Sequence, residues 1–336
     1  MCSRAKKLED VLRVLDFKPL HLSQLDELFE ETAEARDPNL SRRTEIANYL
    51  QTENNVKVLV TGHPGSGKST EIAKFQDEQI ATYTVISFSM MDEGQLSQAS
   101  LEALLVLIVE AVTRQVKNLN IKLNDKTLES IYKWFSEAFE IKEQQLEMVL
   151  QGGAHADTSQ SILGKLIGIG AYLKSDIKTG SNTLHRCVTR ENHRLSELVN
   201  QVNILVKEAR LAVKEKSKRE MLLIIEDLDK LSIEATDTIF LRNPAPLADI
   251  SCKMIFTAPI WLLCTPASAI LDSLFKKVTI PMIKVVEKNG EKCEIGRKVI
   301  RQILDRRMDI KTLIDDDAIE LAIEKTGGCY DIFLRR

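Results

Sequence analysis

The spacing of apolar residues changes along the chain, and these changes predict which segments are helices and which are strands. In the first fifty residues, apolar side chains recur every three or four positions, in Leu8–Leu15 and again in Leu22–Phe29. That spacing is typical of amphipathic helices, and Pro19 separates the two. A third helix is expected to begin near Ser41, because serine commonly caps helix N-termini.

Five short apolar runs follow a different pattern and predict buried strands. They occupy residues 56–60, 84–88, 221–225, 253–257 and 278–282. Helical patterns separate these runs, and such alternation is typical of a parallel sheet with crossover helices. The sequence therefore predicts the α/β fold class.

The gap between the second and third runs is too long for one crossover and predicts a mainly helical insertion at about residues 93–218. Its apolar stripe at 199–213 is expected to pack against the sheet rather than in a long coiled coil. Residues 151–183 are rich in Gly and Ser and weakly periodic, so we expect a mobile or partner-dependent segment. After the fifth run, helices are predicted over 295–308 and from Asp315 to Gly327.

Composition narrows the class of partners. The chain has 336 residues, with 46 Lys+Arg against 49 Asp+Glu, so the net charge of −3 offers no protein-wide attraction for nucleic acid or anionic lipid. Only a local basic patch would bind nucleic acid. Six scattered cysteines form no CxxC pair, which argues for reduced thiols rather than zinc or disulfides. The longest apolar run, Ile162–Leu173, is shorter than the roughly 20 residues of a membrane span. We expect a cytoplasmic protein with no membrane partner.

The strongest chemical signal is a glycine-rich stretch directly after the first strand and before a helical pattern. It matches GxxxxGK[ST] at each fixed position, the pattern of a phosphate-binding P-loop. Glycines let successive N–H groups point at phosphate oxygens, and the helix that follows adds its positive N-terminal end. Lys68 supplies a charge for the β/γ-phosphates, and the Ser69 hydroxyl is a ligand for Mg²⁺.

The motif defines the candidate ATP-binding residues Gly62, His63, Pro64, Gly65, Ser66, Gly67, Lys68, Ser69 and Thr70. His63 occupies a variable position, so we do not expect it to be catalytic. Arg42 and Arg43, at the start of the helix before the first strand, either line the adenine and ribose or form a solvated helix start.

Three carboxylates follow the buried run Met221–Ile225, and they are candidates for metal binding and catalysis. Acids directly after a buried strand require a cation or a polar network. Glu226 or Asp227 is expected at Mg²⁺, and Asp227 or Asp229 near the attacking water as general base. The sequence leaves these assignments open.

Other candidate groups each have two interpretations. Thr257, at the end of the fourth strand, either senses the γ-phosphate or attacking water or is a satisfied strand-end hydroxyl. Arg306 and Arg307, at the end of a C-terminal helix, either reach phosphates of this or a neighbouring subunit or are solvated.

With these residues in hand, the chain resembles P-loop ATPases of the AAA+/STAND group, nearest the origin-recognition/Cdc6-like branch. It is more closely similar to bacterial AAA-family ATPases. The resemblance spans roughly residues 10–330, through Gly62–Glu71, Glu226–Lys230, Thr257–Pro259 and Ile280–Val285. It implies a five-stranded parallel sheet, ATP·Mg²⁺ binding between the core and a small C-terminal helical lid, and nucleotide-dependent self-association.

The resemblance divides the chain into an N-terminal helical segment (1–50), a P-loop ATPase core with the insertion (51–290) and an incomplete lid (291–336). Two departures from the family pattern stand against fast hydrolysis. Lys276-Lys277 replaces the arginine finger before the last strand, and Gly327–Asp331 lacks the sensor-2 arginine unless Arg335 or Arg336 substitutes. A C-terminal region common in relatives is expected to be absent or on another chain.

These observations lead to an expected function and to alternatives. We expect a slowly hydrolysing switch ATPase that forms homo-oligomers or controls an effector protein. Many relatives do this in bacterial antiphage systems, beside a nuclease or other toxic partner. The alternatives are a DNA-associated loader or initiator ATPase, a module that binds ATP without turnover, and a small-molecule kinase. The near-neutral charge and the missing winged helix count against the loader, and the three carboxylates and helical lid against the kinase.

Overall fold

The computed structural model describes residues 4–15, 20–90, 100–138, 161–179, 193–327 and 329. The chain divides into two compact units, which are described in turn. The first unit comprises Met1–Tyr49, Val60–Gln79 and Lys277–Arg336, and the second comprises Leu50–Leu59 and Ile80–Lys276.

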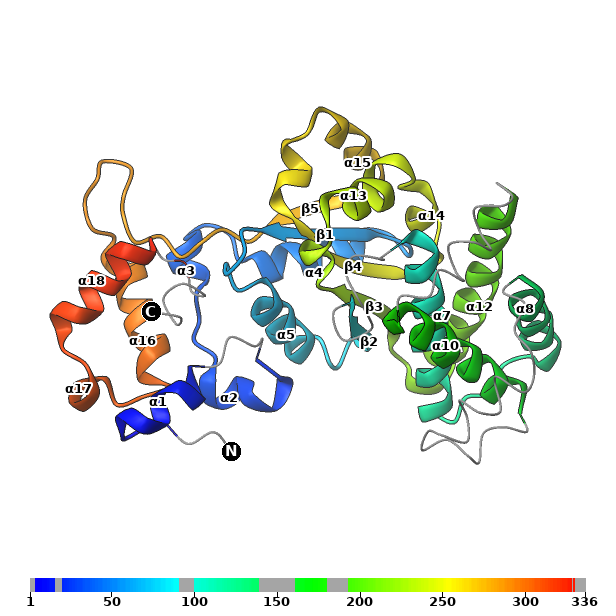
Figure 1. Ribbon diagram of the computed structural model, residues 1–336, viewed down its shortest axis with the longest axis horizontal. Helices are drawn as coiled ribbons and strands as arrows, with labels where there is room; N and C mark the ends of the chain where they lie inside the picture. The colour runs from blue at the N-terminus through cyan, green and yellow to red at the C-terminus, as the bar shows by residue number, and fades with distance from the viewer. Residues whose placement is uncertain are drawn as a thin grey trace. The chain divides into compact units, whose positions relative to one another are not determined.

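Five strands form one parallel sheet in the order β2-β3-β4-β1-β5 (Figure 1). The strands are β1 (Lys57–Gly62), β2 (Tyr83–Ser89), β3 (Glu220–Glu226), β4 (Lys253–Pro259) and β5 (Lys276–Thr279). Each apolar run in the sequence therefore coincides with a strand or overlaps one, and the α/β prediction is confirmed. The fifth prediction is wrong at its end, because β5 stops at Thr279 and residues 280–282 have no regular structure. Pro281 lacks an N–H group for a strand ladder, so the sheet pairing cannot continue through it.

The central strands β1, β3 and β4 are buried along almost their whole length. Tyr83 pairs with Glu220 at the start of β2 and β3, and Leu222 pairs with Lys253 at the start of the β3–β4 ladder. All seven residues of β4 are buried. Strands covered on both faces read as continuous apolar runs rather than alternating ones, which matches the sequence pattern here.

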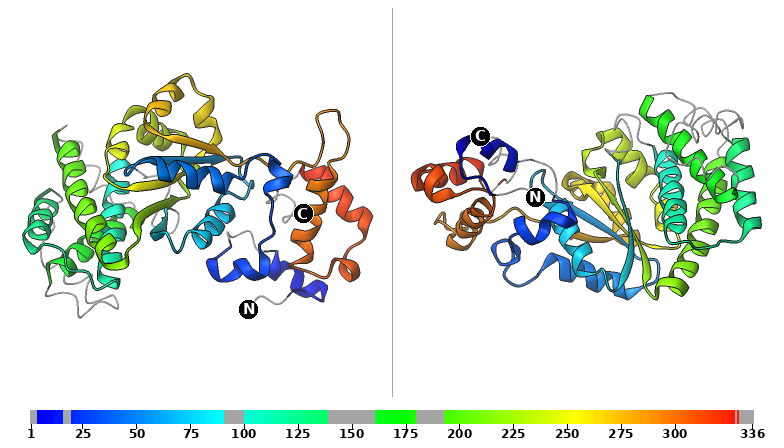
Figure 2. Two further views of the ribbon diagram at one scale, coloured as in Figure 1. Left: turned by 180° about the vertical axis from the view of Figure 1, so that it is seen from behind. Right: turned by 90° about the horizontal axis from the view of Figure 1, so that it is seen from below.

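The second unit contains the helical insertion, whose described helices gather into one bundle (Figures 1 and 2). They are α7 (Leu101–Asn118), α8 (Asp125–Ala138), α10 (Ile162–Thr179) and α12 (His193–Ser217). The predicted stripe on α12 is buried and packs on α7, α8 and β3, so it covers the sheet as expected. Ser100 caps α7, because its side chain accepts a hydrogen bond from the N–H of Ala103.

The prediction for residues 151–183 is wrong in part, because α10 occupies Ile162–Thr179. Its glycines weakened the helical signal, since glycine has a low helix propensity. Close packing between helices explains at least one of these glycines. A Cβ atom on Gly170 would lie 2.5 Å from Cγ of Glu110, so α10 approaches α7 closely at this position. The rest of the predicted segment lies outside the described residues.

Short helices complete the second unit around β3 and β4. They are η4 (Leu228–Lys230), α13 (Ile233–Thr236), a π-helical turn η5 (Asp237–Arg242), α14 (Ala245–Ala248), η6 (Ile260–Cys264), η7 (Pro266–Ser268) and α15 (Ala269–Leu274). Phe240, Phe256 and Phe275 meet edge to face, with ring centroids 6.2 Å apart, in the core between these turns and β4.

The first unit joins the two ends of the chain to the segment after β1. Its helices are α1 (Leu8–Val14), η1 (Leu22–Gln24), α2 (Leu25–Leu28), α3 (Ala33–Arg36), α4 (Arg42–Thr52, which runs into the second unit), α5 (Lys68–Glu78), α16 (Glu294–Asp305), α17 (Ile310–Leu313) and α18 (Asp316–Thr326). Ala5 pairs with the backbone at Arg307 and Asp309, so the N-terminal segment is bound to the C-terminal helices. A shared apolar core includes Ala35, Ile283, Ile303 and Ile323.

The two predicted C-terminal helices are confirmed in type and approximate position. Asp315 directly precedes α18, and Gly327 ends it in the left-handed conformation (φ 57°), as the aspartate run and the double glycine indicated. Across the described ranges, no helix combines the length and the apolar character that crossing a bilayer requires.

Candidate functional site

The glycine-rich loop connects β1 to α5, as the motif predicted, and its first glycine packs against the segment that follows β5. A Cβ atom on Gly62 would lie 2.5 Å from the carbonyl oxygen of Ile280, so only glycine fits at the end of β1. Gly67 adopts φ 84° directly before α5, a conformation that side chains rarely allow. The loop therefore ends at the positive N-terminus of an 11-residue helix.

Lys68 begins α5 and folds back over the loop. Its Nζ atom donates to the carbonyl oxygens of Gly62, at 3.2 Å, and His63, at 3.1 Å. The residue is 6% exposed. Ser66 is also buried, and its hydroxyl finds no hydrogen-bond partner within the described residues. A buried cation and an orphan hydroxyl in one loop suit an anionic ligand, because each would gain a partner from it.

An open pocket lies beside this loop, entirely within the first unit. It encloses about 460 Å³ when the open solvent at its mouth is included. Its polar wall includes Gly65, Ser66, Gly67 and Thr70 from the loop and α5. Its apolar wall is formed by Leu20, Leu28, Phe29, Ile283 and Ile303.

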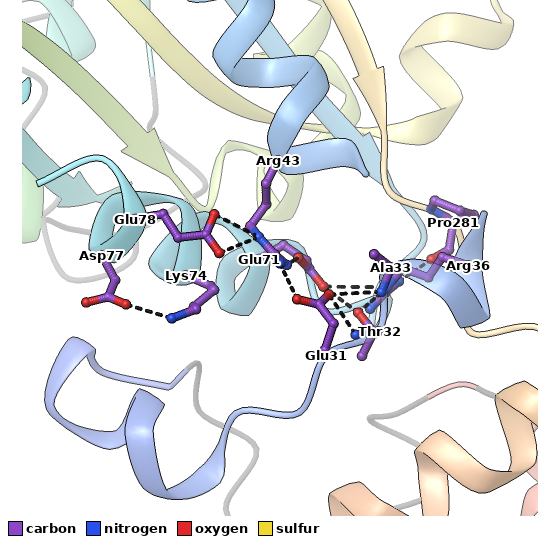
Figure 3. A network of polar contacts seen from close by, with 10 residues as sticks. All are labelled: Glu31, Thr32, Ala33, Arg36, Arg43, Glu71, Lys74, Asp77, Glu78 and Pro281. Atoms are coloured by element: carbon purple, nitrogen blue, oxygen red, sulfur yellow. Dashed lines mark hydrogen bonds and ion pairs between the residues drawn. The ribbon is translucent and has the colours of Figure 1, made fainter. Parts of the chain in front are cut away.

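A network of buried charges centred on Glu71 lies behind the loop (Figure 3). Glu71 is 5% exposed and accepts hydrogen bonds from Arg43 Nη1, at 2.5 Å, and from the Thr32 hydroxyl, at 2.5 Å. Arg43 also pairs with Glu31 and with Glu78. Burial alone would lower the pKa of Arg43, but the charge of Glu71 and the bond to Glu31 outweigh burial and raise it. Arg43 therefore stays charged and links α4 to α5.

The two arginines predicted beside the adenine have structural partners. Arg42 binds Asp37 and Glu45, each at 2.9 Å, whereas Arg43 belongs to the Glu71 network. Both also line a second, smaller cavity of about 240 Å³, together with Ser41 and Ile280. Contact of either arginine with adenine or ribose stays a prediction.

The predicted carboxylates lie at the end of β3, in the second unit. Asp227 is 8% exposed and adopts the left-handed conformation (φ 65°), which is uncommon outside glycine. Its carboxylate accepts a hydrogen bond from Ser89, at the end of β2, and contacts Lys230 Nζ at 2.6 Å. Glu226 and Asp229 flank it and are half-buried. The carboxylate of Asp227 is therefore held in one orientation by two neighbours.

Thr257 lies in β4, fully buried, and its hydroxyl has no hydrogen-bond partner in the described part of the chain. Such a group is rare in folded proteins, and a ligand or water would satisfy it. The alternative, a strand-end hydroxyl satisfied by a hydrogen bond, is therefore not supported within the described residues. The sensor role stays a prediction.

Among the described residues, no group of three or more His, Cys, Asp or Glu side chains is arranged to hold a metal ion. Mg²⁺ at nucleotide sites usually takes one or two protein groups, with phosphates and water as the remaining ligands. Within the first unit, the half-exposed Ser69 at the start of α5 is a hydroxyl of the kind that such a site uses.

Sequence reasoning missed several residues of the pocket and of the acidic strand end. Ser89 had a usable signal, since it is a polar residue at the carboxyl end of a strand. Arg36 and Thr32 had none, because no pattern connects them to the loop. Arg307 was predicted either to reach phosphates or to be solvated, and its burial shows that the solvated alternative is wrong. It is 5% exposed, lines the pocket and donates to the carbonyls of Leu28 and Ile303.

The sequence departs at two places from the pattern of the ATPases that it resembles, and the structure describes one of them. Lys276 and Lys277 begin β5, so they belong to the strand itself rather than to a loop before it. Arg335 and Arg336, and most of the Gly327–Asp331 motif, lie outside the described residues.

No protein-family model matches this chain, and no curated protein matches it either.

Proposed function

We propose that this chain binds ATP with Mg²⁺ at the loop between β1 and α5 and hydrolyses it slowly. The observation that carries the proposal is the pocket in which the backbone of Gly65, Ser66 and Gly67 meets the N-terminus of α5. Main-chain N–H groups and the helix end are complementary to phosphate oxygens. Ligands of open parallel sheets bind beyond the carboxyl ends of the strands, and this loop follows such an end.

Each loop residue has a role in this proposal. Lys68 exchanges the carbonyl oxygens of Gly62 and His63 for phosphate oxygens, which match its charge better. The orphan hydroxyl of Ser66 gains an acceptor. Ser69 provides the hydroxyl ligand for Mg²⁺, which, when bound, neutralises charge developing on the phosphates.

Hydrolysis is assigned to the carboxylates after β3. Asp227 has the most defined orientation, because Ser89 donates to it and Lys230 contacts it. In the proposed reaction, Asp227 or Asp229 accepts a hydrogen bond from the attacking water, and Glu226 or Asp227 serves the metal.

We further propose that nucleotide binding controls self-assembly or an effector protein. Support comes from the composition of the pocket wall. Residues before β1 (Phe29, Thr32) and after β5 (Ile283, Ile303) line the same pocket as the loop. A ligand there contacts segments from both ends of the chain, and its binding would bias their arrangement.

Binding is tested with Lys68→Ala, measured by titration of a fluorescent ATP analogue. We expect the affinity to fall at least tenfold, since charged hydrogen bonds contribute about 1.5–3 kcal/mol. Lys133→Ala is the matched control, because Lys133 is 75% exposed on α8. Unchanged affinity in Lys68→Ala would refute ATP binding at this loop.

Turnover is tested by phosphate release at saturating ATP. Asp227→Asn keeps the size of the side chain and should lower the rate by a factor of about 100 or more if the carboxylate is the base. Glu234→Gln, an exposed acid on α13, is the control. Wild-type protein that binds ATP but releases no phosphate would favour the ATP-binding module without turnover. Light scattering with and without ATP tests self-assembly.

A further inference from the structure

The guanidinium of Arg36 lies at the boundary of the two cavities, beside the loop proposed to hold phosphate. It lines the larger pocket with Ser66 and Gly67 and the smaller cavity with Arg42 and Arg43. Its Nη2 atom is 3.0 Å from the position of a Cβ atom on Gly67, so it packs directly on the loop backbone. Only 7% of the side chain is exposed. Arg36 is therefore a buried cation in contact with the loop.

The partners of Arg36 compensate its charge only in part (Figure 3). Its Nε donates to the Thr32 hydroxyl at 2.9 Å, and its Nη1 donates to the carbonyl oxygen of Pro281. Both partners are neutral. Among the described residues, Glu71 is the one carboxylate within 4 Å, at 3.6 Å, and it already accepts from Arg43. Burial lowers the pKa of Arg36, and Glu71 offsets that only partly.

We infer that Arg36 is a second phosphate-binding cation of the nucleotide site, beside Lys68. This rests on the proposed function. Nε and Nη1 donate to Thr32 and Pro281, and Nη2, on the loop side, makes no hydrogen bond within the described residues. A guanidinium presents a planar fork of donors that fits phosphate oxygens, whereas a lysine acts as a point charge. Phosphate oxygens therefore complete the donor set of Arg36 and balance its buried charge.

The test separates phosphate from nucleoside contacts. A fluorescent ATP analogue is displaced by ATP, by tripolyphosphate and by adenosine, in wild type and in Arg36→Gln. We expect Arg36→Gln to lower the affinity for ATP and for tripolyphosphate about tenfold to hundredfold. Each 1.4 kcal/mol lost with a charged hydrogen bond lowers the affinity by a factor of ten. The affinity for adenosine should change less than twofold. An equal loss of affinity for adenosine, or an unchanged affinity for tripolyphosphate, would overturn the inference.

A second variant guards against a folding effect. Arg36→Gln removes a counter-charge of Glu71, so Arg36→Gln/Glu71→Gln removes both charges together. We expect the double variant to keep the weakened tripolyphosphate binding. Restored wild-type affinity would mean that Arg36 acts only by holding Glu71. Arg301→Gln is the control, since Arg301 pairs with Asp316 and Glu320 and lines neither cavity.

The outcome also separates this inference from the function on which it rests. If wild type fails to bind the analogue, or Lys68→Ala binds it normally, the proposed function falls and the inference falls with it. Only the inference is refuted if wild type binds the analogue, Lys68→Ala does not, and tripolyphosphate displaces the analogue from Arg36→Gln as readily as from wild type.

Discussion

The ion pair between Arg43 and Glu71 can be broken from either side, and the burial of both groups sets the expected cost. Arg43 has a side-chain exposure of 8% and Glu71 of 6%, and their atoms are 2.5 Å apart. Removing one partner of a buried pair costs about 3–5 kcal/mol, because the other charge is left without compensation. Glu71 would keep the Thr32 hydroxyl and Arg36. We therefore expect Arg43→Gln to lower the free energy of unfolding by about 3 kcal/mol.

The remaining partners of Arg43 lower the expected cost of replacing Glu71 instead. Glu31 and Glu78 are 54% and 37% exposed, so their pairs with Arg43 contribute at most about 1 kcal/mol each. They still compensate Arg43 after Glu71→Gln, so this variant should lose only about 1–2 kcal/mol. The double variant should lose less than the sum of the two, with a coupling of about 2 kcal/mol for groups in direct contact.

Urea unfolding followed by far-ultraviolet circular dichroism measures these values across the chain. Tryptophan fluorescence is the complementary probe, because Trp134 and Trp261 both belong to the second unit, whereas Arg43 belongs to the first. Arg242→Gln is the control, since Arg242 is 67% exposed in its pair with Asp237. A loss below about 1 kcal/mol for Arg43→Gln, or additive single effects, would refute the assignment of this pair as a buried coupled unit.

Three further predictions follow from single side chains. Burial lowers the pKa of Lys57 to about 8, so stability should rise as pH increases from about 8 towards 10.5, and Lys57→Met should flatten that rise in urea titrations. Burial raises the pKa of Glu31, but the hydrogen bonds from Arg43 and from the Ala33 and Thr32 N–H groups, together with the charge of Arg43, outweigh burial and lower it. Glu31→Gln should therefore reduce the loss of stability below pH 4.5. An equally steep acid profile in that variant would contradict this. Gly296→Ala would place Cβ 1.8 Å from the carbonyl oxygen of Lys284, so we expect a thermal midpoint several degrees lower, with exposed Lys298→Ala on the same helix unchanged.

Local patterns predicted the position of each strand to within a few residues. The apolar runs of β1, β3 and β4 were recognisable because these strands are buried along almost their whole length. The fifth run overlaps β5 only at Val278 and Thr279. The glycine loop was recognisable because its backbone conformation restricts residue type at Gly62 and Gly67. The prediction failed for Ile162–Thr179, where close contact with α7 accounts for a glycine that local propensity penalises.

Long-range contacts decided the surroundings of the candidate site. Arg36 meets Pro281 across 245 residues of sequence, and Ser89 meets Asp227 across 138, and no periodicity or motif marks either pair. The sequence by itself determined the approximate positions of the strands, the glycine-rich loop and the acidic end of β3, because each is a local requirement of backbone geometry or residue chemistry. Only the tertiary structure decided which buried charges share a partner, because burial and charge compensation depend on segments that meet after folding.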